Sequence, residues 1–318
     1  MAGGRAVRYA RQTILPGFGA AGQSRLAGAD LLVVGAGGLG VPVLQYLAGA
    51  GIGRITLVDP DRAEVSNLHR QPIFGRHIGR PKAEAAAVEM AALNPDCRIT
   101  PLVTRLDPAN APDLVAGADL VLDCADSFAV TYTLSDACLA AGRPLIAGSV
   151  LGTQGFAGGF CAGAPSVRAV FPDLPAQAGN CATAGVMGAM AGLIGAIQAQ
   201  MALTVLLGMT PSPLGQMIRF DGLRPASFRF DDAPEPQTGH RFIAPGQMRP
   251  DDIAVELRGM DEAPLPFVPH ALRGPDLPRP QDGRRVVLAC RSGLRAWAAA
   301  ERLRRDWPGE IALIATGD

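Results

Sequence analysis

The sequence contains almost no lysine and no excess of either charge. Of its 29 basic residues, 28 are arginine, and Lys82 is the single lysine. The formal net charge is zero, which argues against a generic polyanion such as nucleic acid as a partner and leaves any basic function local. A chain that uses arginine almost everywhere but lysine once indicates a position that needs a compact ammonium rather than a planar guanidinium.

Paired cysteines, an apolar signal core and a membrane-length apolar run are also missing. No two of the six cysteines form a C-x-x-C pair, and the first residues, Met1 to Arg5, have no apolar core. The longest apolar run, 184–197, has 14 residues. That is short of the ~20 needed to span a bilayer, so we expect a buried helix. We therefore expect a cytoplasmic protein with reduced thiols and no membrane partner.

Strand-like and helix-like segments alternate along the first half of the chain. This alternation predicts an α/β fold with a doubly wound, Rossmann-like, mainly parallel sheet. Ligands of such sheets bind beyond the carboxyl ends of the strands. The expected strands are 30–34, 54–58, 98–103, 119–123 and 144–149, and the expected helices are 39–51, 79–93, 108–117 and 127–142.

The pattern changes at about residue 153. Segments 158–162 and 167–171, a long helix ending at Leu207, and strands at 216–220 and 224–230 predict an antiparallel extension of the sheet. We expect three parts of the chain: a first domain over 1–230, a proline-rich linker over 231–250 and a small α/β module over 251–318.

A glycine-rich turn closes the first expected strand. The stretch Gly35-Ala36-Gly37-Gly38-Leu39-Gly40 matches the fingerprint that lets a backbone approach phosphate at a helix N-terminus. Asp59 follows Gly40 by 19 residues, close to the separation expected for a ribose ligand, and Asp61 comes next but one. Taken alone, these features fit a nicotinamide or flavin enzyme, so a nucleotide-dependent oxidoreductase stays open as an alternative.

Three cations and a further aspartate favour a more highly charged nucleotide. Arg70 and Lys82, with Arg11 upstream, offer more positive charge than the pyrophosphate of a dinucleotide needs. A triphosphate attacked at its α-phosphorus needs such charge on its oxygens and on the leaving pyrophosphate. Asp126, at the end of the fourth expected strand, suits a magnesium ion bound to those phosphates.

A set of motifs follows in collinear order along residues 8 to about 230. They are Arg8-Tyr9-Ala10-Arg11-Gln12, the glycine turn, Asp59, Ser66-Asn67-Leu68-His69-Arg70-Gln71, Pro81-Lys82, Asp123-Cys124-Ala125-Asp126, and Asn180-Cys181-Ala182-Thr183-Ala184-Gly185-Val186. In these motifs the chain resembles the ThiF/MoeB/HesA family, the bacterial relatives of ubiquitin-activating enzymes. The resemblance implies an enzyme that uses ATP to adenylate the C-terminal glycine of a ubiquitin-like sulfur-carrier protein ending in Gly-Gly, of the molybdopterin or thiamine type.

The resemblance also implies roles for single residues. Asp59 would hold the ribose and Asp126 the Mg²⁺. Asn67, Arg70 and Lys82 would act on the phosphates. Arg11 resembles an arginine that the family contributes across a dimer interface, which implies a homodimer. The carrier's carboxylate is itself the nucleophile, so no protein base is required. The implied ATP site comprises Gly35, Gly37, Gly38, Gly40, Asp59, Asp61, Ser66, Asn67, Leu68, His69, Arg70, Lys82, Asp126 and Ser127.

The chain departs from the family pattern in its cysteines and after Asp126. Many relatives bind a structural zinc with two C-x-x-C pairs, but the matching segments here, 166–169 and 223–231, contain no cysteine, so we expect no zinc. Ser127 stands where the family usually has Asn. Cys181 precedes a helix expected to open at Gly185, where a thiolate would be stabilised; a covalent bond to the carrier and a buried, inert thiol both stay open.

The tail carries a second cysteine motif. Cys290-Arg291-Ser292-Gly293-Leu294-Arg295 joins an expected strand to an expected helix and resembles the active loop of rhodanese sulfurtransferases. Successive N–H groups there would stabilise a Cys290 thiolate or persulfide, and a cysteine desulfurase is a candidate sulfur donor. The module is short, so a vestigial tail is one alternative. For the chain as a whole, a non-catalytic carrier-binding scaffold is another.

Overall fold

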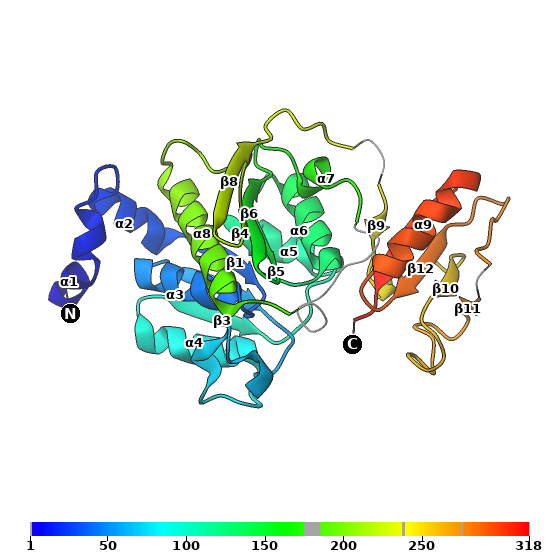
Figure 1. Ribbon diagram of the computed structural model, residues 1–318, viewed down its shortest axis with the longest axis horizontal. Coiled ribbons are helices and arrows are strands. Elements are labelled where there is room, and N and C mark those ends of the chain that lie inside the picture. The colour runs from blue at the N-terminus through cyan, green and yellow to red at the C-terminus, as the bar shows by residue number, and fades with distance from the viewer. Residues whose placement is uncertain (1, 175–184, 237–238, 275, 318) are drawn as a thin grey trace.

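The computed structural model describes residues 2–174, 185–236, 239–274 and 276–317, and within these the chain forms two units, each built on one sheet (Figure 1). The larger sheet has eight strands in the order β3-β2-β1-β4-β5-β6-β7-β8. Its strands are β1 (Asp30–Val34), β2 (Arg54–Val58), β3 (Arg98–Leu102), β4 (Leu120–Asp123), β5 (Leu145–Leu151), β6 (Gln154–Phe160), β7 (Gln216–Asp221) and β8 (Arg224–Arg229).

The first five strands run parallel, and the last three extend the sheet in antiparallel order. This confirms the predicted α/β fold with a mainly parallel, doubly wound sheet. The helices of this unit are α1 (Ala2–Thr13), α2 (Gly19–Gly28), α3 (Gly40–Ala50), α4 (Lys82–Leu93), α5 (Ala111–Ala116), α6 (Phe128–Ala141), α7 (Val167–Val170) and α8 (Gly188–Leu207), with short 3₁₀ turns η1 (Val65–Asn67) and η2 (Pro72–Phe74).

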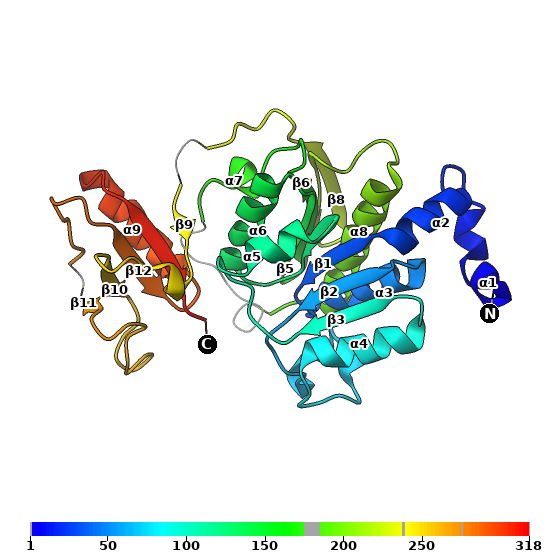
Figure 2. The same ribbon diagram turned by 180° about the vertical axis from the view of Figure 1, so that it is seen from behind.

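Alternate residues of the parallel strands enter two different cores. On β1, Leu31 and Val33 pack with α3, α4 and α8, whereas Leu32 and Val34 pack with α5 and α6 on the other face. Strands buried on both faces are apolar at nearly every position, which is why their sequence signal is continuous rather than alternating. The two views in Figures 1 and 2 show these two layers of helices from opposite sides.

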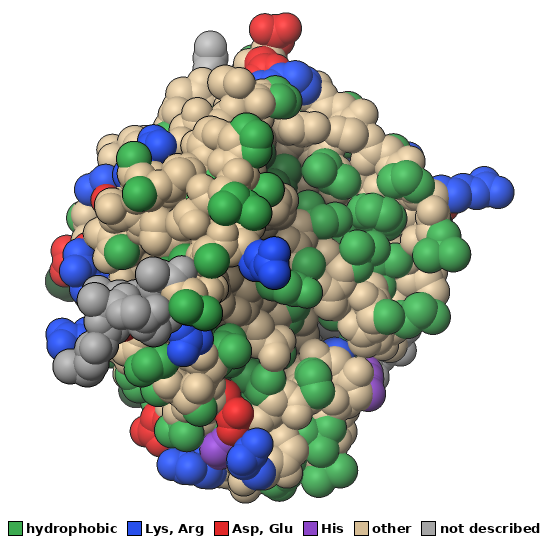
Figure 3. Space-filling model, turned by 90° about the vertical axis from the view of Figure 1, so that its left-hand side faces the viewer, with side chains coloured by type: hydrophobic (Ala, Val, Ile, Leu, Met, Phe, Trp, Pro, Cys, Tyr) green, Lys and Arg blue, Asp and Glu red, His purple; other side chains and the backbone are tan. Residues whose placement is uncertain are grey.

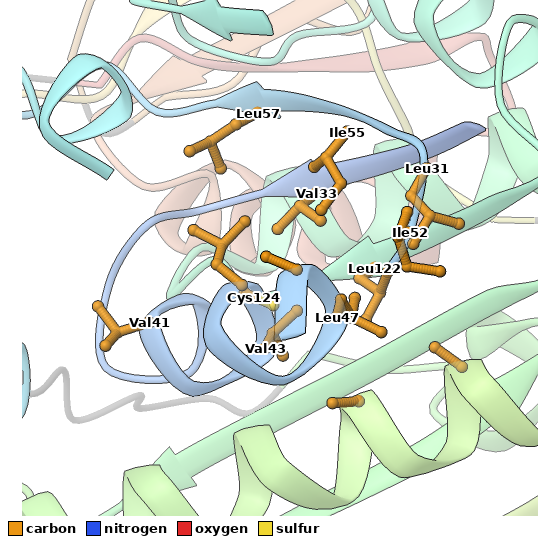
Figure 4. Packing of buried hydrophobic residues seen from close by; sticks show 14 of the residues in the cluster. Leu31, Val33, Val41, Val43, Leu47, Ile52, Ile55, Leu57, Leu122 and Cys124 are labelled. Atoms are coloured by element: carbon orange, nitrogen blue, oxygen red, sulfur yellow. The ribbon is translucent and has the colours of Figure 1, made fainter. Parts of the chain in front are cut away.

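Helix α3 lies directly against the first strands and carries the glycine turn at its start. Figure 4 shows Val43 and Leu47 of α3 beside Leu31 and Val33 of β1, within the larger core cluster. Each fully buried aliphatic side chain of this kind contributes about 1.5–3 kcal/mol. The N-terminus of α3 is therefore fixed rigidly at the carboxyl end of β1.

The segment 167–171, expected as a strand, is a helix instead. The Ser166 side chain accepts a hydrogen bond from the N–H of Ala169 and so caps α7. Before it, Cys161 and Ala162 have φ of 62° and 50°, which turns the chain out of β6. The valines of this segment predict a strand, but the Ser166 cap and the turn at Cys161 and Ala162 favour a helix.

Helix α8 begins at Gly188 and ends at Leu207, where the long helix predicted from the sequence is also expected to end. It spans 20 residues, because Gln198 does not interrupt it: the buried amide donates to the carbonyl oxygen of Asp123 at 2.7 Å. Among the described residues, α8 is the one helix long and apolar enough to cross a membrane, and half of its apolar window is buried inside the protein.

The second unit has a five-stranded, all-parallel sheet in the order β11-β10-β12-β13-β9. Its strand β9 lies within the stretch expected to be a linker, so pairing of the second sheet begins before residue 251. Its elements are β9 (Arg241–Phe242), η3 (Pro245–Gln247), β10 (Ile253–Glu256), β11 (Leu272–Arg273), β12 (Val286–Cys290), α9 (Leu294–Asp306) and β13 (Ile311–Ala315).

The two units share one apolar seam. The ring of Trp297, on α9, packs edge-on against the ring of Tyr132, on α6, with centroids 5.5 Å apart. The guanidinium of Arg168 lies 4.7 Å from the Tyr132 ring centroid and forms a bidentate ion pair with Asp136. These contacts belong to the same hydrophobic cluster that contains Cys290, so the tail is packed onto the larger unit.

Candidate nucleotide site

The glycine turn at the start of α3 is shaped by close backbone approaches. Gly35 has φ of +97°, and a Cβ there would lie 2.6 Å from the carbonyl oxygen of Cys124. A Cβ on Gly40 would overlap the carbonyl oxygen of Gly35. At these two positions only glycine fits. Among the described residues, the N–H groups of Gly37, Gly38 and Leu39 have no partner, so they form a free donor set at the N-terminus of α3.

Two main-chain N–H groups hold the Asp59 carboxylate next to this turn. The carboxylate accepts hydrogen bonds from the N–H of Ala36 at 2.6 Å and from the N–H of Asp61 at 2.8 Å. Burial raises the pKa of Asp59, while these two bonds and the nearby charge of Lys82 oppose the rise. The second lone pair of each carboxylate oxygen is left for further donors, such as ribose hydroxyls.

Lys82 is buried and paired. The residue is 6% exposed, and its ammonium donates to the Asp61 carboxylate at 2.8 Å. Asp61 is largely exposed, with 63% of its side-chain surface open to solvent. The main chain repeats the link, since the N–H of Lys82 donates to the carbonyl oxygen of Asp61. An unbroken series of hydrogen bonds thus runs from the glycine turn through Asp59 and Asp61 to the lysine.

The segment 66–70 lies against the other side of the turn. The Arg70 side chain packs over Gly38, with its Cδ 3.3 Å from the position a Gly38 Cβ would take. Its guanidinium also contacts the ring of His69 at 2.8 Å, and both side chains are reachable from solvent. Ser66 and Asn67 hydrogen-bond to each other at 3.3 Å, and Leu68 packs on the core. Arg70 is the member of this segment that reaches the turn.

Asp126 belongs to the loop that follows β4, and that loop touches the glycine turn. A Cβ on Gly35 would meet the Cys124 carbonyl and the Ala125 N–H. Asp126 is exposed, whereas Asp123 is fully buried and accepts hydrogen bonds from Thr131 at 2.5 Å and from the Ala125 N–H at 3.1 Å. Burial raises the pKa of Asp123 to about 7. Ser127 begins α6 without a side-chain cap bond.

Gln71 is a residue that the sequence analysis quoted in a motif but gave no role. It is 2% exposed, its Oε1 has no hydrogen-bond partner, and its Nε2 lies 3.7 Å from the position of a Gly37 Cβ. The signal available in the sequence was its place next to Arg70. Its orientation toward the turn depends on the fold of 66–74 and could not be foreseen.

Arg11 does not lie with the residues around the glycine turn. Cys181 falls outside the described residues, and the helix expected to open at Gly185 begins at Gly188. Arg11 is exposed on α1, which binds the far ends of α3 and α4: Gln12 donates to the Ala50 carbonyl at 2.7 Å and Arg8 to the Leu93 carbonyl at 2.8 Å. Those helix ends lie at the amino edge of the sheet, opposite the glycine turn.

Cys290 ends β12 and is completely buried. Its sulfur accepts a hydrogen bond from the N–H of Ala296 at 3.4 Å, at the start of α9. Gly293 turns the chain with φ of +85°, and a Cβ there would lie 2.6 Å from the ring of Phe242. One guanidinium nitrogen of Arg295 donates to both carboxylate oxygens of Glu262. The turn is therefore closed by Phe242 of β9.

A preformed metal cluster is not found in the part of the chain that the structure describes, since no three His, Cys, Asp or Glu side chains converge there. A single carboxylate is nevertheless a suitable protein ligand for Mg²⁺, which usually keeps several waters and binds substrate phosphates. Asp126 is the exposed carboxylate next to the glycine turn that could serve in this way.

Comparison with known proteins gives consistent matches over this unit. The ThiF family pattern matches residues 9–240. The adenylyltransferase and sulfurtransferase MOCS3 of Drosophila grimshawi is 44% identical over 68% of this chain and 49% of its own length. The SAMP-activating enzyme E1 of Haloferax volcanii is 40% identical over 68% of this chain and 81% of its own.

Solved structures agree on the fold. E. coli MccB aligns with a TM-score of 0.61 over 70% of this chain and 68% of its own, at 22% identity. PaaA aligns with a TM-score of 0.59 over 72% and 75%, at 19% identity. The chain spans about half the length of the MOCS3 relatives it matches. The family pattern covers well over half of this chain, with the glycine turn, Asp59, Lys82 and Asp126 inside the matched region. The chain belongs to the ThiF family.

Proposed function

We propose that this chain adenylates the C-terminal carboxylate of a ubiquitin-like sulfur-carrier protein ending in Gly-Gly, with ATP as the adenylate donor. The observation that carries the proposal is the buried Lys82–Asp61 pair, linked through Asp59 to the glycine turn. A dinucleotide site needs the turn and the ribose aspartate, but not a desolvated ammonium beside them. The activities named for the MOCS3 and SAMP-activating relatives support the same class of reaction.

The site has features that suit the phosphates and the ribose of a nucleotide. The Cβ-free turn lets phosphate approach the N-terminus of α3, where unpaired N–H groups and the helix dipole favour negative charge. Asp59 follows the glycine turn at the sequence separation expected of a ribose ligand, and its carboxylate oxygens keep lone pairs free for further donors. Asp126, beside the turn, would hold a magnesium ion that neutralises phosphate charge when bound.

In the proposed reaction the carrier's carboxylate oxygen forms a bond to the α-phosphorus. The bond between that phosphorus and the bridging oxygen breaks, and pyrophosphate leaves with the electron pair. Arg70, packed over Gly38, and Lys82 would offset the charge of the phosphate chain. Because Lys82 is paired with a largely exposed Asp61, its ammonium can exchange that carboxylate for a phosphate oxygen at small cost.

The carrier would bind along the antiparallel end of the sheet. A groove of about 580 Å³ there is lined by Phe156, Phe171 and Phe228, and the first two rings lie 5.5 Å apart. Its end at the β5–β6 turn joins the nucleotide side, because Gly152 pairs with Gly185 and Met187 just before α8. A flexible Gly-Gly tail leaving this groove would have a short path to the glycine turn.

We propose a homodimer in which Arg11 serves the partner's site. Arg11 lies at the amino edge of its own sheet, away from its own glycine turn. The same side carries exposed apolar residues, among them Val7, Ile14 and Tyr46. Figure 3 views the molecule from this side and shows hydrophobic side chains gathered to the upper right of the face. A second copy covering that surface would bury it and deliver the arginine.

Sulfur transfer from Cys290 is a second proposed step. A persulfide on Cys290, loaded by a donor such as a cysteine desulfurase, would attack the carrier's acyl-adenylate with its terminal sulfur and displace AMP. A second thiol would then attack the Cys290 sulfur and release the carrier thiocarboxylate, leaving a disulfide. The N–H of Ala296 already points at the sulfur, as an anion cradle requires. Cys290 is buried, so this step needs Phe242 to move.

The adenylation proposal is tested by pyrophosphate exchange. Labelled pyrophosphate should enter ATP in the presence of a Gly-Gly carrier, and mass spectrometry should show the carrier gaining AMP. Lys82→Ala and Asp126→Ala should each lose exchange by more than about 100-fold while the carrier still binds. Asp119→Ala, a substitution at the amino end of β4, is the matched control and should retain exchange.

The alternatives predict different results in the same assay. An oxidoreductase would bind NADH, show no exchange and leave the carrier unmodified. A non-catalytic scaffold would bind the carrier in wild type and variants alike, without exchange in either. We also propose a cytoplasmic location, which cell fractionation would test.

A further inference from the structure

Gln71 carries a buried amide that the protein does not satisfy. Its side chain is almost fully enclosed, and its Oε1 has no hydrogen-bond partner. Leaving such a group unpaired costs about 1–3 kcal/mol, so native proteins rarely keep one without a use. The backbone of the residue is well fixed: its N–H donates to the Asn67 carbonyl at 3.0 Å and its carbonyl accepts from Phe74 at 3.2 Å.

The amide faces the anion-binding end of α3. Its Nε2 is 3.7 Å from the Cβ position of Gly37, the residue whose N–H opens the free donor set of the turn. Gly37 differs from Gly35 and Gly40 in what a Cβ would meet. At Gly35 and Gly40 a Cβ would overlap backbone atoms, whereas at Gly37 it would lie at ordinary van der Waals distance from the Gln71 side chain. The free N–H groups of the helix N-terminus and the NH₂ end of the Gln71 amide, for which no acceptor is found among the described residues, are two separate observations, and both lie at Gly37.

We infer that Gln71 is a nucleotide-binding residue whose amide NH₂ donates to a phosphate oxygen seated on the turn. The inference rests on the proposed function, which supplies the nucleotide. A neutral amide adds a directed donor without adding a further positive charge, which complements Arg70 on one side of the turn and Lys82 on the other. No described protein group selects the orientation of the amide, so the phosphate selects it.

This role makes an unusual prediction for a buried polar residue. Gln71→Met keeps the length of the side chain and removes both polar ends, so the apo protein loses an unsatisfied group rather than a bond. Its melting temperature should stay equal or rise. Its affinity for ATP and for AMP should fall about tenfold, because one charge-assisted hydrogen bond is lost. Its affinity for adenosine, which has no phosphate, should not change.

The measurements are isothermal titrations of ATP, AMP and adenosine without carrier, together with thermal melts. Gln198→Met is the matched control for stability: its amide is buried too but bonded to the Asp123 carbonyl at 2.7 Å, so that variant should melt lower. If Gln71→Met does not fold, Gln71→Asn, which draws the amide back by one methylene, gives the same comparison of phosphate-bearing and phosphate-free ligands.

Two results would overturn the inference: an ATP affinity within about twofold of wild type, or an equal loss for adenosine. A wild-type protein that binds ATP but never exchanges pyrophosphate sinks the proposed adenylation and leaves this assignment standing. If the wild type exchanges pyrophosphate normally and Gln71→Met binds ATP as tightly as the wild type, the assignment of Gln71 is wrong while the proposed adenylation stands.

Discussion

The carboxylate of Glu235 accepts two hydrogen bonds from Ser166, one from the main-chain N–H and one from the hydroxyl, each 2.6 Å long. Ser166 lies in the first of the two cysteine-free segments for which the sequence analysis expects no zinc, 166–169, and Glu235 lies four residues beyond the second, 223–231. This pair therefore joins the start of α7 to the chain just beyond the second segment through charge-assisted hydrogen bonds.

Removing this tie should loosen the two segments. Glu235→Ala is expected to lower the free energy of unfolding by about 1–2 kcal/mol, because two charge-assisted bonds are lost at a partly exposed site. Asp232→Ala, nearby and exposed, is the control and should change little. Urea unfolding measures both. A chelator should leave the melting temperature unchanged; a large drop on chelation would contradict the expected absence of zinc.

Gly40→Ala and Gly37→Ala form a matched pair within the turn. At Gly40 the new methyl would overlap the Gly35 carbonyl, so the backbone must shift and the unfolding free energy should fall by about 1–3 kcal/mol. At Gly37 the nearest described atom is 3.7 Å away, so stability should hold while ATP affinity falls, because the methyl enters the space of the phosphate. Thermal melts and ATP titrations separate the two effects. Equal destabilisation would refute this account of the turn.

The bounds of the parallel strands could be predicted closely, because each strand is an apolar stretch that ends at a residue typical of a turn. The expected strands 30–34 and 54–58 match β1 and β2 residue for residue, since both are apolar stretches closed by Gly35 and Asp59. The segment 167–171 and strand β9 could not. The first depends on a cap and a turn, and the second exists only because β13 offers it an edge.

The candidate site shows the same division. Its motifs pointed to the carboxyl ends of β1, β2 and β4, and the structure brings Gly35, Asp59 and the Asp126 loop together there. The pairing of Lys82 with Asp61 and the unpaired amide of Gln71 arise from contacts between segments distant from the turn in sequence. Residue types predict what chemistry is available, whereas protonation, pairing and enclosure are set by tertiary structure.

Subunit mixing tests the proposed trans role of Arg11. Arg11→Ala and Lys82→Ala should each be inactive in pyrophosphate exchange. If the arginine acts across the dimer, a heterodimer of the two has one complete site. Mixing equal amounts under exchange of subunits should then recover about a quarter of wild-type activity. Recovery of none would place Arg11 in its own chain's site or outside the chemistry, while Arg11→Lys on its own tests the need for a guanidinium.

Asp123 should give the protein an unusual pH dependence. Its pKa is raised to about 7 by burial, above the ordinary value of 3.8 in the unfolded chain. Between these values the folded state binds more protons, so this carboxyl's contribution to stability falls as pH rises from about 4 to 7 and is flat above. The difference in unfolding free energy between wild type and Asp123→Asn should follow that curve. A difference that does not vary with pH would mean the carboxyl stays ionised when folded.

The closed turn around Cys290 predicts a slow thiol. With no exposed surface and Phe242 packed on Gly293, Cys290 should react with iodoacetamide far more slowly in the native protein than in urea. Phe242→Ala removes the ring that covers the turn and should speed alkylation at least about tenfold without unfolding the sheet, because β9 is a two-residue edge strand. Phe228→Ala, at an exposed ring on β8, is the control. Peptide mass spectrometry of Cys290 reads out both variants, and a native rate already equal to that in urea would mean that the turn opens without help from β9.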